Sequence, residues 1–180
     1  GGGNTVSNLS STRALRDVTE RGHRGSYAAA AVGEVNVVAK MAATNALIGG
    51  EGNGGVIFPK LHAGRDALVG IALFLTLLAK KKKSVSELRR EYPVYYMSKR
   101  RADLPEGTDT KALFARIAER FASDHPNTID GVKIDFPSSW VHMRASNTEP
   151  IVRIYTEAPT EEEANSLGEK FCNIVLEMLR

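Results

Sequence analysis

This chain of 180 residues has a single cysteine, few long apolar runs and no initiating Met. The single cysteine, Cys172, excludes an internal disulfide framework and a thiolate metal site, so we expect a reduced, cytoplasmic setting. The longest apolar stretch, 67–79, is shorter than the roughly 20 residues of a membrane span, and we predict a buried helix there and no membrane contact. The chain begins Gly-Gly-Gly-Asn without an initiating Met or a secretory signal, and we expect this start to be a cut in a longer protein.

Excess charge of one sign is also small. The chain has 24 Lys and Arg against 21 Asp and Glu, a net charge of +3. This balance disfavours a committed nucleic-acid binder, although it suits a pocket that receives anions. The histidines are scattered without ligand spacing, so we expect no metal site in this chain. A hydrophobic content of 42 % is enough for the cores of one or two domains.

Apolar runs typical of strands alternate with helical patterns over residues 1–97. The predicted strands cover 6–9, 27–32, 46–48 and 56–58, and the predicted helices cover 14–22, 33–44, 64–82 and a short piece after Ser84. In the helix over 33–44, Val35, Val38 and Ala42 share one predicted face. Alternation of this kind indicates an α/β domain with a mixed sheet.

The pattern changes after Pro93. We predict a helix capped by Asp109, three strands over 128–136, 140–144 and 151–157, and a last helix with Thr160 and Glu163 as its capping box. These elements predict a smaller α+β domain over 105–180, with an antiparallel sheet and two flanking helices.

A glycine-rich turn at 49–55 is the first feature that suggests chemistry. Glycine lets the backbone adopt positive φ and lets a ligand approach closely. Glu51 and Asn53 place a carboxylate and an amide two positions apart, between Gly52 and Gly54. Such a pair can hydrogen-bond the adjacent hydroxyls of a sugar. An ordinary tight turn is the alternative; a phosphate loop is disfavoured because Gly-Lys-Ser/Thr is absent and Glu51 would repel phosphate.

A second polar loop runs from Arg144 to Pro150 between two predicted strands. It contains a guanidinium, two hydroxyls and an amide, from Arg144, Ser146, Thr148 and Asn147. A guanidinium fork matches phosphate oxygens, and consecutive backbone N–H groups in a turn form an anion site. The alternative is a Ser/Asn/Thr turn beside a solvated arginine.

The two loops together resemble those of the α-D-phosphohexomutase family, which includes phosphoglucomutases, phosphomannomutases and phosphoglucosamine mutases. Gly50-Glu51-Gly52-Asn53-Gly54 matches the family's sugar loop Gly-Glu-x-Ser/Asn-Gly, and 144–150 matches its phosphate loop Arg-x-Ser-Asn-Thr-x-Pro. The resemblance covers nearly the whole chain. Residues 1–97 look like the family's third domain and 105–180 like its fourth, joined by a hinge at 98–104.

The resemblance implies a role in substrate binding. Family members transfer phosphate between a phosphoserine and a hexose phosphate, with Mg²⁺ and a hexose bisphosphate intermediate. The serine and metal motifs belong to the first two domains, are absent here, and would be supplied by N-terminal catalytic domains of the same polypeptide. We therefore expect no catalytic residue in this chain. The residues implied in binding are Glu51, Gly52, Asn53 and Gly54 for sugar hydroxyls, Arg144, Ser146, Asn147, Thr148 and Arg153 for phosphate, and Arg13 and Glu34 in the cleft.

Two points stay open at this stage. The chain departs from one branch of the family, with Val32-Gly33-Glu34 in place of Thr-Gly-His and Ser10 in place of Lys, so the hexose is not fixed. The residues Gly52 and Asn53 in the sugar loop slightly favour phosphoglucosamine or phosphomannose as the substrate. A non-catalytic module that binds sugar phosphates shares both loops and is the rival interpretation.

Overall fold

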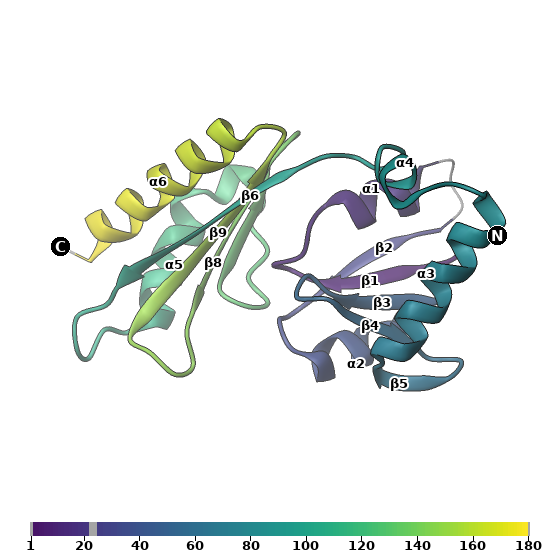
Figure 1. The fold of residues 1–180 in the computed structure, drawn as a ribbon. Helices are drawn as coiled ribbons and strands as arrows, with labels where there is room; N and C mark the ends of the chain where they lie inside the picture. Colours follow the sequence, from purple (N-terminus) through teal and green to yellow (C-terminus); the bar gives the residue numbers. More distant parts are fainter. Residues whose placement is uncertain (1, 22–24, 180) are drawn as a thin grey trace. The chain divides into compact units, whose positions relative to one another are not determined.

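The computed structural model describes residues 2–21 and 25–179. The chain divides into two compact units, Gly1–Val94 and Tyr95–Arg180, and each has its own sheet (Figure 1). We call them the first and the second unit. The first has a mixed sheet with helices on both faces, and the second has an antiparallel sheet with two helices. The predicted fold class is confirmed.

The sheet of the first unit has the order β2-β1-β3-β4-β5. Its strands are β1 (Thr5–Asn8), β2 (Tyr27–Ala30), β3 (Ile48–Glu51), β4 (Gly55–Phe58) and β5 (His62–Arg65). Its helices are α1 (Ala14–Glu20), α2 (Glu34–Thr44), α3 (Ala67–Lys81) and α4 (Val85–Arg89). Strands β1, β2 and β3 are parallel, whereas β4 and β5 are added antiparallel as hairpins. The predicted end of α1 at Gly22 lies outside the described residues.

The core of the first unit lies between the sheet and α2. Val37 and Met41 of α2 pack against Val6 of β1 and Ile57 of β4, and all four are buried. The predicted apolar face of this helix is wrong in part, because Val35 is 81 % exposed. Val37 and Met41 are four residues apart and therefore lie one above the other on the helix surface that meets the sheet.

Helix α3 lies on the other face of the sheet, where Gly70 contacts Val56 of β4. We predicted a buried helix here, and that prediction is wrong, because none of its residues is buried. Leu68, Ile71 and Leu75 are exposed although they are apolar. In the described parts of the chain, no helix combines the length and the hydropathy needed to cross a bilayer.

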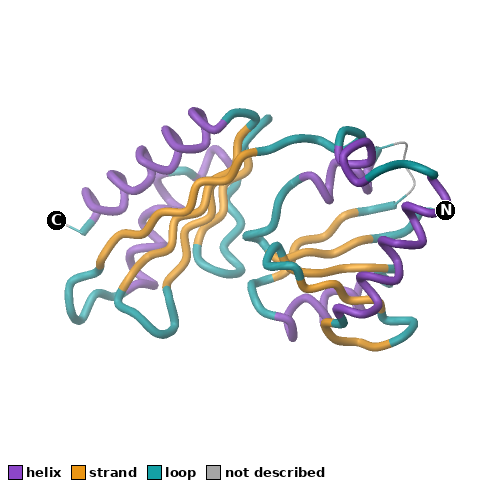
Figure 2. Tube along the Cα trace, viewed as in Figure 1, coloured by secondary structure: helices purple, strands orange, loops and turns teal. Residues whose placement is uncertain are grey.

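The glycine-rich stretch is a β-hairpin with a very short turn, as the loop between β3 and β4 in Figure 2 shows. Gly49 and Gly50 belong to β3, so the predicted strand at 46–48 lies too early in the chain. Gly49 lies against Met41 and Gly50 against the carbonyl oxygen of Gly55, and a Cβ at either position would come within 2.5 Å or 2.1 Å of those atoms. These glycines are required by close packing in the strand, and Gly54, with φ of 98°, supplies the turn.

The second unit has a four-stranded antiparallel sheet in the order β6-β9-β8-β7. Its strands are β6 (Tyr96–Asp103), β7 (Val132–Asp135), β8 (Trp140–Ala145) and β9 (Ile151–Ala158). Its helices are α5 (Thr110–Arg120) and α6 (Glu161–Met178), with a 3-10 turn at Ala122–Asp124. The predicted caps are confirmed: Asp109 accepts from Lys111 and Ala112, and Thr160 and Glu163 form a capping box.

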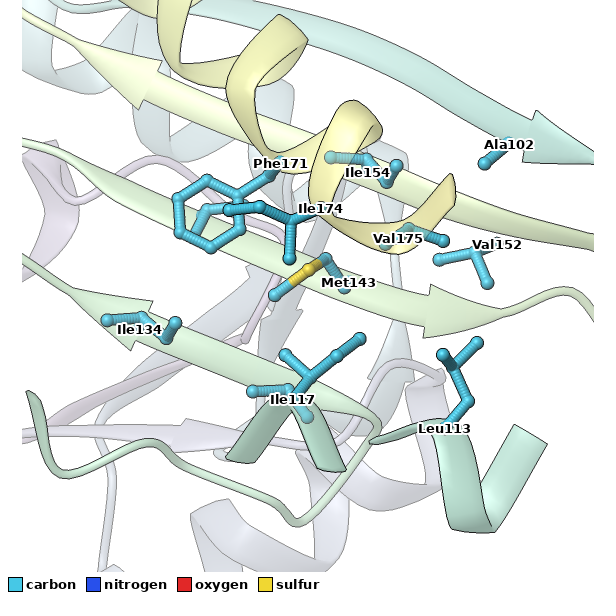
Figure 3. Close-up of a cluster of buried hydrophobic side chains, with 12 residues drawn as sticks. Ala102, Leu113, Ile117, Ile134, Met143, Val152, Ile154, Phe171, Ile174 and Val175 are labelled. Atoms are coloured by element: carbon cyan, nitrogen blue, oxygen red, sulfur yellow. The ribbon is translucent and has the colours of Figure 1, made fainter. Parts of the chain in front are cut away.

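Both helices pack on one face of this sheet. Figure 3 shows Ile117 of α5 and Phe171 of α6 pointing into the same cluster as Met143 of β8 and Ile154 of β9. Because side chains alternate between the faces of a strand, Arg144 and Arg153, their neighbours in sequence, lie on the opposite face. This alternation places the basic residues of β8 and β9 away from the core.

The segment predicted as a hinge, 98–104, lies almost wholly in β6. This strand pairs with β9 along its entire length, from Tyr96 with Ala158 to Asp103 with Ile151. A bend within it would break the ladder of hydrogen bonds. The hinge predicted at 98–104 stays a prediction.

Candidate functional site

Three polar groups meet where the parallel strands of the first unit end. Asn8 is the last residue of β1, Glu51 is the last residue of β3, and Gly33 follows β2 at the start of α2. In open α/β sheets, ligands bind outside the carboxyl ends of the strands. This edge is therefore the candidate site of the first unit.

The Glu51 carboxylate is anchored by protein groups. Its Oε1 atom accepts from Asn8 Nδ2 at 2.9 Å and from the Gly33 amide at 3.1 Å. Its Oε2 atom lies 3.8 Å from an Arg65 guanidinium nitrogen, and the side chain is only 5 % exposed. A carboxylate has about four acceptor positions, so Oε2 retains capacity for a ligand hydroxyl.

Asn8 and Ser11 hold the hairpin against β1. The Asn8 Oδ1 atom accepts from the Ser10 amide at 3.0 Å and from the Ser11 hydroxyl at 2.8 Å. Ser11 Oγ in turn accepts from the Gly52 amide at 2.9 Å. Neither residue was predicted for the site. An asparagine near the end of the predicted strand at 6–9 was the available signal.

Glu34 and Arg65 form a close ion pair beside Glu51. Glu34 Oε1 accepts from the Arg65 amide at 2.7 Å, and Oε2 accepts from Arg65 Nε at 2.8 Å. The backbone hydrogen bond from Arg65, and then its guanidinium, lower the pKa of Glu34. Two glycines make room: a Cβ at Gly55 would lie 2.5 Å from Arg65 Cδ, and one at Gly64 would lie 3.1 Å from Glu34 Oε1. Arg65 was not predicted for the site.

Asn53 is at the exposed crown of the hairpin, where its Oδ1 atom accepts from the Gly55 amide at 3.3 Å. Glu34, Asn53, Gly54 and Arg65 line one hollow of about 530 Å³. Glu51 and Gly52 line a second hollow of about 260 Å³ with Ser11. The predicted cleft residue Arg13 pairs with Asp17 on α1 at 3.7 Å and, within the described chain, lines neither hollow.

The second polar loop is the β8–β9 hairpin, closed by the Ser146 amide donating to the Ile151 carbonyl at 3.0 Å. The Asn147 and Thr148 side chains are exposed at its tip. Among the described residues, the amides of Asn147 and Glu149 donate to no protein acceptor. The Thr148 amide points to Ser146 Oγ at a long 3.4 Å. The hairpin thus presents a run of backbone donors of the kind that binds anions.

Arg153 lies beside this run of donors. Its guanidinium is 3.4 Å from Ser146 Oγ and 3.4 Å from Glu149 Oε2. Glu149 is the one residue here that opposes anion binding, and its pairing with Arg153 partly offsets that charge. The structure therefore brings together Arg144, Ser146, Asn147, Thr148 and Arg153, the residues that the sequence analysis selected.

The same face of the sheet carries a buried polar cluster farther along the strands. Trp140 Nε1 donates to Glu157 Oε1 at 2.8 Å, and Lys133 Nζ lies 4.5 Å from the centre of the indole ring. His142 contacts the Asp130 carbonyl at 2.7 Å, so its Nε2 carries the proton. Burial lowers the pKa of His142 to about 4.

No group of three His, Cys, Asp or Glu side chains able to hold a metal is present in the described chain. The two carboxylates of the first-unit site, Glu34 and Glu51, bond to amides and lie beside the Arg65 guanidinium, whose positive charge opposes a cation there. These residues do not fit a magnesium ion.

The fold and the two polar loops define a class: an α/β unit with a carboxylate at its strand ends, followed by an α+β unit with a cationic hairpin. Two family descriptions match the chain, "Phosphoglucomutase/phosphomannomutase, alpha/beta/alpha domain III" over residues 1–95 and "Phosphoglucomutase/phosphomannomutase, C-terminal domain" over 100–174. The chain belongs to the phosphoglucomutase/phosphomannomutase family, that is, to the α-D-phosphohexomutases.

Curated relatives agree with this family. A phosphoglucomutase/phosphomannomutase of Thermococcus kodakarensis is 38 % identical over 182 aligned residues, covering 100 % of this chain and 39 % of that protein. A phosphoglucosamine/phosphogalactosamine mutase of Sulfurisphaera tokodaii is 40 % identical over 146 residues, covering 80 % of this chain and 32 % of that protein. The chain thus spans at most about two fifths of the length of these relatives.

Solved structures show the same fold. A phosphoglucomutase/phosphomannomutase family protein of Burkholderia thailandensis aligns with a TM-score of 0.78 and 24 % identity, covering 98 % of this chain and 38 % of that one. N-acetylphosphoglucosamine mutase of Aspergillus fumigatus, solved with GlcNAc-6P and magnesium, aligns with a TM-score of 0.66 and 18 % identity, covering 98 % of this chain and 39 % of that one.

Proposed function

We propose that this chain is the substrate-binding part of a phosphohexomutase that interconverts a hexose 1-phosphate and a hexose 6-phosphate. The observation that carries the proposal is the pair of polar hairpins, one anchored carboxylate loop and one cationic loop, in a chain of this family. In the whole enzyme, a phosphoserine and a bisphosphorylated hexose would carry the phosphate between the two positions. Phosphoglucosamine, phosphomannose and phosphoglucose are the candidate substrates.

The Glu51 hairpin would bind the sugar. Its carboxylate is fixed by Asn8 and Gly33, so a hydroxyl that reaches Oε2 meets an acceptor that is already oriented. Asn53 would add a donor and an acceptor at the crown. Fixed partners lower the entropic cost of holding the hexose in one pose, which is the main contribution a binding domain can make to phosphoryl transfer.

The 144–150 hairpin, together with Arg153, would bind the phosphate that is not reacting. Backbone amides and hydroxyls can surround a phosphate dianion, and guanidinium groups match its oxygens. Holding this end of the hexose phosphate would leave the other end for the chemistry.

The bond-making groups would belong to the part of the enzyme that this chain does not span. The A. fumigatus neighbour was solved with magnesium, whereas the described residues here do not fit that ion. N-terminal domains of the same polypeptide would supply the phosphoserine and the metal.

Calorimetric titration of this chain with glucose 6-phosphate, glucose and inorganic phosphate tests the proposal. Binding should be strongest for glucose 6-phosphate. Glu51→Gln should weaken glucose 6-phosphate more than inorganic phosphate, and Ser146→Ala should weaken both. The chain alone should show no mutase turnover, whereas the full-length protein should convert hexose 1-phosphate to hexose 6-phosphate. Turnover by the isolated chain, or no binding of any sugar phosphate, contradicts the proposal. Binding without turnover by the full-length protein favours a sugar-phosphate-binding module.

A further inference from the structure

Three arginines form one row across the sheet of the second unit. The strand register places Arg144 of β8 directly opposite Arg153 of β9, and Arg153 directly opposite Arg101 of β6. Their neighbours Met143, Ile154 and Ala102 belong to the core. By alternation, all three arginines lie on the face of the sheet that α5 and α6 do not cover.

A row of three like charges is unfavourable unless something neutralises it. Like charges directly opposite each other on neighbouring strands destabilise a sheet. Among the described residues, the ion pair of Arg153 with Glu149 supplies the row's one acidic partner within 4.0 Å. The Nε atoms of Arg144 and Arg153 are buried and have no hydrogen-bond partner among residues 2–21 and 25–179.

A hollow of about 420 Å³ adjoins the row. Lys99, Arg101, Arg153 and Tyr155 line it, together with Glu149. Lys99 lies over the Tyr155 ring, with Nζ 5.4 Å from the ring centre, and Lys99 and Arg100 add further positive charge to the lining. The hollow is therefore an electropositive concavity next to the 144–150 hairpin.

We propose that Arg101 is a further phosphate-binding residue, which with Arg153 binds the phosphate monoester held by the 144–150 hairpin. The inference rests on the proposed function and extends its phosphate site onto β6. Neighbouring strands are about 5 Å apart, a distance that extended arginine side chains span, so guanidinium groups of β6 and β9 can converge on one phosphate. The dianion supplies the negative charge that the row lacks and can accept hydrogen bonds from its guanidinium groups.

The test compares Arg101→Gln with Lys111→Gln in the 180-residue chain. Both substitutions remove one positive charge, but Lys111 is exposed in the first turn of α5, which packs on the opposite face. The affinity for inorganic phosphate, measured by calorimetry, should fall about tenfold in Arg101→Gln. In Lys111→Gln it should stay within about twofold, because salt screens a distant exposed charge.

Thermal unfolding gives a second readout that a merely structural arginine would not produce. In phosphate-free buffer, Arg101→Gln should unfold at the same or a higher temperature than the wild type, because a like charge is removed from the row. Added phosphate should stabilise the wild type and stabilise Arg101→Gln much less. Arg101→Lys, which keeps the charge and loses the planar fork, should be intermediate.

The outcomes separate this inference from the proposed function. If Arg101→Gln and Arg101→Lys both bind phosphate as tightly as the wild type, Arg101 is a solvated surface residue and the inference fails alone. An equal loss in Lys111→Gln also overturns it, because the effect is then general electrostatics. If the wild type binds neither inorganic phosphate nor glucose 6-phosphate, the proposed function fails and this inference fails with it.

Discussion

Asn8 and Glu51 end two neighbouring parallel strands, and the Asn8 side-chain amide donates to Glu51 Oε1 at 2.9 Å. The other side of the same amide accepts from Ser10 and Ser11. Asn8 therefore connects the carboxylate of the candidate sugar site to the turn that leaves β1. Because Asn8 is almost fully buried, water cannot replace it as the hydrogen-bond partner of these groups.

Asn8→Ala should destabilise the first unit and release Glu51. The substitution leaves buried partners without their hydrogen bonds, which costs about 2–3 kcal/mol. Urea unfolding followed by circular dichroism measures this loss. Asn53→Ala, at the exposed crown, is the control for the same change of residue type and should cost well under half as much. Equal stability of Asn8→Ala and the wild type would show that the connection contributes nothing.

The Glu34–Arg65 pair predicts an acid-sensitive first unit. Hydrogen bonds from the Arg65 amide and guanidinium lower the pKa of Glu34 below its usual 4.5. A carboxyl whose pKa is lowered by folding contributes stability above its unfolded pKa and loses that contribution as the pH falls through the folded pKa. The stability of the first unit should therefore decline below about pH 4.5.

Glu34→Gln should remove this decline. The variant should be less stable than the wild type at pH 7 and should approach it at low pH, because the wild type then also lacks the charge. Hydrogen exchange of first-unit amides, recorded at several pH values, measures the difference. Glu20→Gln, at the exposed end of α1, should retain the wild-type profile. A Glu34→Gln profile parallel to that of the wild type at every pH would be contrary to this prediction.

Much of the second unit could be predicted from the sequence because its signals are local. The Thr160–Glu163 capping box and the Asp109 cap depend on residues within one turn of helix, and the structure contains both. The 144–150 hairpin is bounded by apolar strands, so its position was also predictable. The pairing of β9 with β6 creates the row of three arginines. This pairing depends on the order of the strands in the sheet, which no local sequence pattern reveals.

The first unit was harder because packing there is not local. The buried face of α2 was predicted wrongly in part, because Val35, Val37 and Val38 are chemically equivalent. Only the position of the sheet decides which of them is buried. Gly49 and Gly50 looked like turn residues, but the approach of Met41 and Gly55 places them in a strand. Arg65 comes to Glu51 through the β4–β5 hairpin, a strand pair that the sequence analysis did not predict.

The exposed apolar stripe on α3 predicts that the chain associates in solution. Leu68, Ile71 and Leu75 recur at helical spacing and are 77 %, 54 % and 57 % exposed. Contiguous apolar patches of this kind favour association. Sedimentation velocity should show concentration-dependent association, which Leu68→Lys with Leu75→Lys should reduce. Val35→Lys, at an exposed valine of α2, should change it little. Monodisperse monomers at high protein concentration would count against the prediction.

His142 should make the second unit lose stability between about pH 6.5 and 4. Burial lowers its pKa from 6.5 to about 4, so the folded state keeps the imidazole neutral while the unfolded state binds a proton. The unfolded state then binds more protons in this window, and stability rises with pH across it. The loss on acidification should reach about 3 kcal/mol from this residue. His142→Asn should show a smaller loss than the wild type.

Fluorescence of Trp140, the only tryptophan of the chain, reports unfolding of the second unit in this experiment. His125→Asn is the matched control, because His125 is exposed and has a left-handed backbone conformation that asparagine tolerates. Its pH profile should follow that of the wild type. An unchanged profile in His142→Asn would assign the acid sensitivity to other groups.

Glu157 should matter to the second unit chiefly as an acceptor for Trp140. The carboxylate is almost fully buried and accepts from the indole N–H at 2.8 Å. Glu157→Ala would leave that donor buried without a partner, at a cost of about 1–3 kcal/mol beyond the loss of packing. Glu157→Gln keeps an acceptor oxygen at the same position and should recover most of this difference. Trp140 emission during urea unfolding measures both variants at once. If Glu157→Gln were as unstable as Glu157→Ala, the negative charge of Glu157 would be the stabilising feature instead of the hydrogen bond.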